Sequence, residues 1–126
     1  MDPSLAAANF ALWKQALLTR EPQTVAALYA DHATLLPTMA QKVIVDRKGI
    51  ETYFTFFETF LPSVSIVEEH VMEIGEGSYL HCGVYRFTLT MKGAEQEVDA
   101  RFSIVWEKIG GEWKIVHHHS SRVPLV

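Results

Sequence analysis

Three consecutive histidines, His117, His118 and His119, are the residues of this sequence best suited to acid–base chemistry. An imidazole titrates near neutral pH, so it can accept or donate a proton, and it can also bind a metal ion. In an extended strand, alternate side chains point to the same face of the sheet. His117 and His119 are therefore expected to share one face, and His118 is expected to lie on the other.

A metal site needs more ligands than this pair supplies, because an ion such as zinc usually takes at least three protein ligands. No other histidine or carboxylate stands at a recognisable ligand spacing. We therefore expect no metal and no cofactor. Two roles for His117 and His119 stay open: buried, neutral side chains that hydrogen-bond within the fold, or pocket side chains that bind a ligand or move a proton.

The strands that carry the histidines are predicted from the second half of the sequence. Four segments rich in β-branched and aromatic residues are separated by glycine-bearing turns; they are residues 64–75, 78–92, 94–109 and 112–121. Along residues 94–106 the even-numbered side chains are mostly apolar, so this face is expected to pack against helices. A tight turn within residues 109–111 then brings His117 and His119 onto this inner face and leaves His118 outside.

The hairpin before it leaves the orientation of Arg86 open. A two-residue turn at Lys92-Gly93 places Arg86 on the outer, polar side opposite Asp99, as an ordinary cross-strand ion pair, and points Tyr85 inward. A three-residue turn with a glycine bulge reverses this parity and turns Arg86 inward. The sequence pattern favours neither turn.

Helical spacing of apolar residues predicts three helices in the first half of the chain. The predicted elements are helices at about residues 3–18, 22–32 and 49–61, and short strands at residues 33–36 and 41–47. The third helix carries an aromatic stripe that includes Tyr53. Helices followed by a meander of strands indicate an α+β fold, with the helices on one face of a curved antiparallel sheet.

The overall composition excludes several classes of protein. A chain of 126 residues is expected to form one domain, residues 1–126, around a single core. The 11 basic and 15 acidic residues give a net charge of -4, which argues against nucleic-acid binding. The single cysteine, Cys82, allows no internal disulfide. No apolar run reaches the roughly 20 residues that span a bilayer, and no secretory signal is recognisable. We therefore expect no membrane partner and a cytoplasmic location.

Several stretches of the sequence resemble one known family. They are TVAALYA (24–30), ATLLPT (33–38), YRF (85–87), ARF (100–102) and WKIVHHHSS (113–121). The sequence is similar to the association (hub) domain of calcium/calmodulin-dependent protein kinase II and its stand-alone bacterial relatives, within the nuclear transport factor 2-like and SnoaL-like superfamily. The similarity runs from about Phe10 to Pro124, nearly the whole chain.

This resemblance implies a cone of three N-terminal helices packed on a curved antiparallel sheet. It also implies self-assembly through the sheet, as a homodimer or a larger ring, and a pocket inside the cone for a small molecule. The pocket arginines of the family favour an anionic molecule; Arg86 matches one of them and is then expected to face inward, whereas Ile104 stands near another. The expected pocket residues are Tyr53, Tyr85, Arg86, His117 and His119.

The same superfamily contains enzymes that resemble ketosteroid isomerase and SnoaL-like polyketide cyclases. Such an enzyme needs a base in a dry pocket and a donor that stabilises an enolate. His117 or His119 would be the base here, with Tyr85 or Tyr53 as the donor. Three hypotheses follow: an oligomerisation module with a ligand pocket, an isomerase- or cyclase-type enzyme, and a pure assembly module whose interior is filled by its own side chains.

Overall fold

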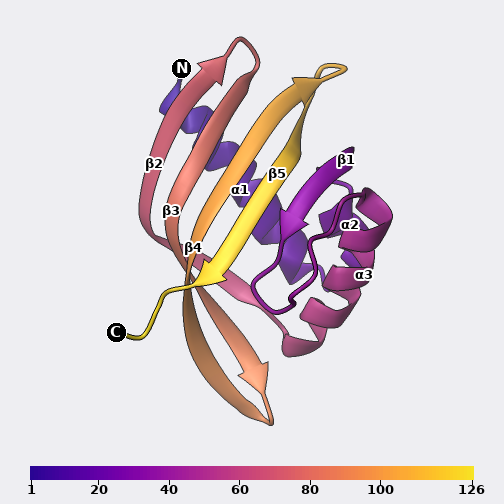
Figure 1. Ribbon diagram of the computed structural model, residues 1–126, viewed down its shortest axis with the longest axis vertical. Helices are drawn as coiled ribbons and strands as arrows, with labels where there is room; N and C mark the ends of the chain where they lie inside the picture. Colours follow the sequence, from indigo (N-terminus) through magenta and orange to yellow (C-terminus); the bar gives the residue numbers. More distant parts are fainter.

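A curved sheet of five strands, with helices against only one of its faces, organises the chain (Figure 1). The structure is a computed structural model that describes all of residues 1–126. The elements are α1 (Pro3–Leu18), α2 (Pro22–Ala26), β1 (Tyr29–Leu36), α3 (Arg47–Phe57), the short 3₁₀ helix η1 (Glu58–Phe60), β2 (Ser63–Gly75), β3 (Ser78–Met91), β4 (Ala94–Ile109) and β5 (Glu112–Arg122). The predicted α+β class is confirmed.

The strand order is β1-β5-β4-β3-β2, so the four long strands form an antiparallel meander and β1 is added at the far edge. β1 runs parallel to β5, with Thr34 opposite His117 and Leu36 opposite His119. α1 crosses behind the long strands, and α3 stands beside β1 (Figure 1). The helices and the inner face of the sheet therefore enclose one interior, and the outer face of the sheet has no helix over it.

The two long helices start where side-chain caps satisfy their first backbone donors. Asp2 Oδ1 accepts a hydrogen bond from the Ser4 amide at 2.9 Å, and Asp46 Oδ1 accepts one from the Gly49 amide at 2.8 Å. The cap at Asp46 explains why α3 begins at Arg47, two residues before the predicted start. No helix has the length and apolar character needed to cross a membrane.

The second predicted helix is wrong in its second half. α2 ends at Ala26, and Tyr29 already belongs to β1. The Ile115 amide donates to the Leu28 carbonyl at 2.8 Å, and the Tyr29 side chain is fully buried, so pairing with β5 overrides the local helical pattern. The predicted strand at residues 41–47 is also reduced, to a single bridge between Ile44 and Leu35.

The predicted inner face of β4 is confirmed, because its even-numbered apolar residues are buried: Val98, Ala100, Phe102, Ile104 and Trp106. The turn before β4 has two residues, since Met91 pairs directly with Ala94. Lys92 and Gly93 have φ angles of 52° and 77°, the left-handed backbone that a tight two-residue hairpin turn requires. This turn places the odd-numbered residues of β3, including Tyr85, inside.

Candidate functional site

One extra residue in β5 decides which histidine points inward. Ile115 pairs with Trp106, but the next pair is His117 with Val105, so Val116 is a bulge without a partner on β4. A bulge of one residue reverses the parity of everything beyond it. His118 therefore lies inside, with 2% of its surface exposed, and His117 and His119 lie on the outer face. The predicted inward orientation of His117 and His119 is wrong for this reason.

His118 bridges two buried tyrosines. Its Nδ1 lies 2.8 Å from Tyr29 Oη and its Nε2 lies 3.0 Å from Tyr85 Oη. Trp13 Nε1 donates to Tyr29 Oη at 3.1 Å. Because an indole can only donate, the arrangement that uses every group has the Tyr29 hydroxyl donating to His118 Nδ1 and His118 Nε2–H donating to Tyr85. Both imidazole nitrogens are then satisfied in a neutral ring.

His118 and the two tyrosines that contact it are electrically neutral around pH 7. Burial, with smaller contributions from His117 and His119, lowers the pKa of His118 from 6.5 to about 3. Burial also raises the pKa of Tyr29 and Tyr85 well above the usual range of tyrosine. A general base works best when its pKa is near the operating pH, so His118 is a weak base at pH 7.

The centre of the cone is nearly filled by side chains. Trp13 stacks on Tyr85 with ring centroids 5.9 Å apart, and Tyr85 stacks on Phe102 at 4.5 Å. The remaining cavity has a volume of about 10 Å³, roughly what a single water-sized sphere occupies. It is lined by Trp13, Leu35, Pro37, Thr38, Tyr53, Phe54, Phe57, Tyr85, Phe87, His118 and Ser120. Tyr53 and Tyr85 both line this small cavity; their role in binding a ligand stays a prediction.

Arg86 lies on the outer face and not in the cone. Its Nε donates to Asp99 Oδ1 at 2.7 Å and its Nη2 donates to Asp99 Oδ2 at 3.1 Å. These hydrogen bonds hold the pKa of Asp99 below its usual value. The inward orientation implied by the family resemblance is wrong, because the two-residue turn at Lys92-Gly93 sets the opposite parity.

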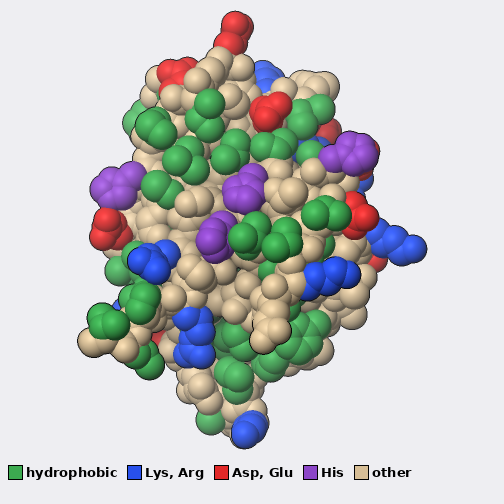
Figure 2. Space-filling view, viewed as in Figure 1, with side chains coloured by type: hydrophobic (Ala, Val, Ile, Leu, Met, Phe, Trp, Pro, Cys, Tyr) green, Lys and Arg blue, Asp and Glu red, His purple; other side chains and the backbone are tan.

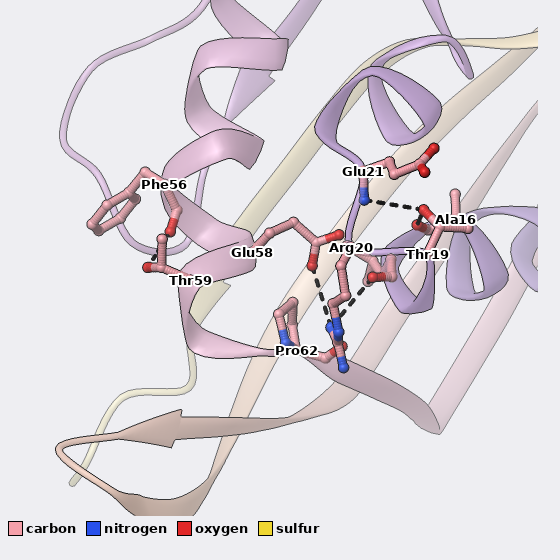
Figure 3. Close-up of polar contacts among 9 residues, drawn as sticks. Ala16, Thr19, Arg20, Glu21, Phe56, Glu58, Thr59 and Pro62 are labelled. Atoms are coloured by element: carbon pink, nitrogen blue, oxygen red, sulfur yellow. Dashed lines mark hydrogen bonds and ion pairs between the residues drawn. The ribbon is translucent and has the colours of Figure 1, made fainter.

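Sequence reasoning missed a polar cluster that ties the end of α1 to the start of β2 (Figure 3). Arg20 Nη1 donates to the Pro62 carbonyl at 2.6 Å and to Glu58 Oε1 at 3.3 Å. Glu58 is 6% exposed, and its burial raises the pKa of its carboxyl. The only sequence signal for this cluster is the helix break at residues 19–22. Because Arg20 and Glu58 bind only each other and nearby backbone, we assign the cluster a structural role.

No group of three or more His, Cys, Asp or Glu side chains lies close enough to hold a metal ion. His117 Nδ1 is occupied by Thr34 Oγ1, at 2.7 Å, and His119 stands alone beyond it. On one chain, the outer pair of histidines supplies two ligands at most.

A model of the family described as calcium/calmodulin dependent protein kinase II association domain matches residues 6–124. A crystal structure of a proposed domain of this kind from Xanthomonas campestris is 42% identical, with a TM-score of 0.96 over 100% of this chain and 91% of that one. No curated protein sequence matches the chain.

Two more distant structures share the fold. The association domain of C. elegans CaMKII is 21% identical, with a TM-score of 0.74 over 94% of this chain and 92% of that one. A ketosteroid isomerase-like protein from Erwinia carotovora atroseptica is 14% identical, with a TM-score of 0.77 over 99% of this chain and 100% of that one. The nuclear transport factor 2-like fold expected from the sequence is confirmed by neighbours of that description.

Proposed function

Because the chain belongs to the calcium/calmodulin dependent protein kinase II association domain family, we propose that it is a self-associating module whose outer sheet face binds a second copy of the same chain. The observation that carries this proposal is a row of side chains across the uncovered face of the sheet. The strand register places five residues side by side in this transverse row: Met72, Leu80, Val105, His117 and Thr34.

The transverse row is apolar on three neighbouring strands. Met72 is 59% exposed, and Leu80 and Val105 are partly exposed although no helix covers them. The space-filling view of this face shows hydrophobic side chains and histidines together over the middle of the sheet (Figure 2). An apolar surface of this kind loses contact with water when a second copy covers it.

A two-fold pairing suits this face, because a symmetric dimer uses the same patch on both copies. Leu80 and Val105 lie directly opposite each other on β3 and on β4, the central strand of the sheet, so the row of one copy can cross the row of the other. Two sheets that pack face to face lie about 10 Å apart, and their inner side chains then interdigitate. A two-fold contact through this face closes at a dimer, so a larger ring would need further contacts on other surfaces.

Light scattering tests the proposal. At micromolar concentration the protein is expected to have the mass of a dimer or a larger assembly, and Val105→Glu is expected to be monomeric because it places a charge in the apolar row. Leu12→Glu is the matched control: it adds the same charge at an exposed residue of α1, on the other side of the sheet. A monomeric parent protein, or an unchanged mass for Val105→Glu with a native circular dichroism spectrum, would contradict the proposal.

A second candidate function is an isomerase- or cyclase-type enzyme that holds its ligand inside the cone. The observation in its favour is the hydrogen bond between His118 and Tyr85 beside Tyr53, a base next to two hydroxyl groups. His118 would replace His117 or His119 as the base. A ligand would have to displace side chains, because little more than one water fits, and the neutral interior offers an anion no positive charge.

Turnover of an enolisable ketone tests this second candidate. We expect no turnover above the uncatalysed rate, and the same rate for His118→Gln. Turnover that is lost in a folded His118→Gln variant would favour the enzyme over the assembly module. Crystals soaked in the same ketone would show whether the cone opens to admit it.

A further inference from the structure

The outer sheet face beside the end of β5 carries a group of cationic and hydroxyl side chains. Two adjoining hollows of about 220 and 200 Å³ lie there and share His119 and Ser121. The first is also lined by Arg101, Phe102 and Ser103, and the second by residues that include Lys42 and Arg122. Neither lining contains an aspartate or a glutamate, in a chain whose net charge is -4.

The three cations of these hollows are unpaired. None of Arg101, Lys42 and Arg122 takes part in an ion pair. The carboxylate nearest to Arg101 on the same face of β4 is that of Asp99, and both of its oxygens are taken by Arg86. In Figure 2, Lys and Arg side chains lie below the central histidines on this face. The two hollows therefore present three cations that no carboxylate pairs with.

The polar side chains along β5 differ in what they already bind. His117 is held by Thr34, His118 by two tyrosines, and the Ser120 hydroxyl by the Thr38 hydroxyl. His119 and Ser121 lie on the outer face, and neither side chain has a hydrogen-bond partner within the chain. Both side chains line the two hollows, so their hydrogen-bonding groups are available to a ligand there.

We propose that Arg101, Ser103, His119 and Ser121 form a binding site for an oxyanion, the phosphate or carboxylate group of a small molecule. Arg101 lies directly opposite Ser121, and Ser103 lies directly opposite His119, so the four side chains form two neighbouring cross-strand pairs on one face. The side chains of such pairs start about 5 Å apart. A guanidinium binds two oxygens of one anion, and the hydroxyls and the imidazole N–H supply further donors.

A cation is the competing occupant, since two histidines at alternate positions of a strand can chelate a metal. The charge of Arg101 on the neighbouring strand opposes it, and no carboxylate or cysteine completes the ligand set. Arg101 is four residues along β4 from Val105, about 13 Å at 3.3 Å per residue. Ser103 and His119 lie two residues from Val105 and His117, so the oxyanion site borders the transverse row, with Arg101 and Ser121 at its far side. The proposal is argued from different residues than self-association.

Binding of inorganic phosphate, followed by nuclear magnetic resonance at constant ionic strength, tests this site. We expect saturable shifts of the Arg101, His119 and Ser121 signals, and an affinity that is weaker by roughly tenfold in Arg101→Gln, because a charge-assisted hydrogen bond is lost. Lys108→Gln is the control, since it removes the same charge from an exposed residue of β4 outside the hollows. A parallel titration with glutarate shows whether phosphate or carboxylate is preferred.

Ser121→Ala guards against a folding defect in Arg101→Gln, and it is expected to weaken binding about threefold, less than Arg101→Gln, because it removes one hydrogen bond from an uncharged donor. The absence of saturable shifts with both anions would overturn the proposal. Equal weakening by Arg101→Gln and Lys108→Gln would also overturn it, because it would show attraction to charge in general and not to this site.

Discussion

The two faces of the sheet differ in almost every physical respect. The inner face is filled by side chains, and His118 there is neutral with both ring nitrogens hydrogen-bonded, whereas the outer face of the single chain is open to solvent and carries unpaired cations and partly exposed apolar side chains. A buried, polar histidine is therefore not by itself a sign of a functional site. The best-connected histidine here has the least freedom to do chemistry, and the least-connected one, His119, has the most.

Three neighbouring residues of one type make this contrast sharp. His118 is neutral and enclosed, His117 is held at the surface by Thr34, and His119 is free. Burial lowers the pKa of His117 less severely than that of His118, in keeping with its partial exposure. The side of the sheet on which each side chain emerges determines its role more than its chemical type does.

The largest expected effect comes from emptying the inner face. Trp13→Ala removes a fully buried ring that stacks on Tyr85 and a donor to Tyr29, so the free energy of unfolding is expected to fall by about 3–5 kcal/mol. Leu12→Ala, one residue away but exposed, is expected to change it by less than about 0.5 kcal/mol. Urea unfolding measures both. Similar losses from the two variants would show that the interior is not tightly packed.

Acid is expected to weaken the inner face through His118. Its pKa is about 3 in the folded chain and about 6.5 when unfolded, so between these pH values the unfolded chain binds the proton more readily. Well above pH 6.5 this group is neutral in both states, so it adds no pH dependence to the free energy of unfolding. Below that pH, the free energy of unfolding falls by up to about 1.4 kcal/mol per pH unit. Urea unfolding from pH 7 to 4 is expected to show a smaller decrease in the free energy of unfolding for His118→Gln than for the parent protein. An equal decrease would mean that another group titrates in this range.

Removing one hydroxyl from the inner network has a smaller expected effect. Tyr85→Phe leaves His118 Nε2–H without its acceptor in a buried place, which is expected to cost about 1–3 kcal/mol. Tyr53→Phe removes an acceptor from the Met39 amide nearer the surface and is expected to cost less, about 0.5–1.5 kcal/mol. Denaturation of the two variants in parallel gives the order; the reverse order would contradict the conclusion that the Tyr85 hydroxyl is the more deeply buried partner.

The smallest expected effect is on the outer face. Arg86→Gln breaks the bidentate pair with Asp99, but both side chains stand in solvent, where an ion pair contributes little to stability. The urea midpoint is expected to stay unchanged within measurement error. A clear decrease would mean that Arg86 is covered in the native assembly, and would extend the proposed interface to this end of the sheet.

Much of the architecture follows from the sequence because it depends on periodic patterns. The alternation along β4 predicts its buried face, and the aromatic spacing predicts α3. The choice of face for the histidines depends on a bulge at Val116, a β-branched residue like Ile115 before it, which carries no local signal for a bulge. Partners that are distant in the sequence make the difference: Tyr29 and Tyr85 each need a buried polar partner, and His118 serves both.

The sequence pattern allows Arg86 to face either side of the sheet, and the family resemblance predicts the inward side, which is wrong. The deciding factor is local, since Lys92 adopts a left-handed backbone that non-glycine residues rarely take. Lys-Gly is a weaker signal for such a turn than Asn-Gly or Asp-Gly, so the pattern of residues alone did not select it. The candidate oxyanion site depends instead on the bulge at Val116, which turns His119 outward onto the face that carries Arg101.

The most direct test of the account uses Cys82, the sole cysteine, which lies opposite Ser103 on the outer face and beside the transverse row. If a second copy covers this face, the rate at which iodoacetamide alkylates Cys82 should fall as protein concentration rises through the range in which the dimer forms. In monomeric Val105→Glu the rate should stay fast at every concentration. An equal rate at all concentrations in the parent protein, while light scattering reports a dimer, would show that the copies meet elsewhere and would contradict the central claim.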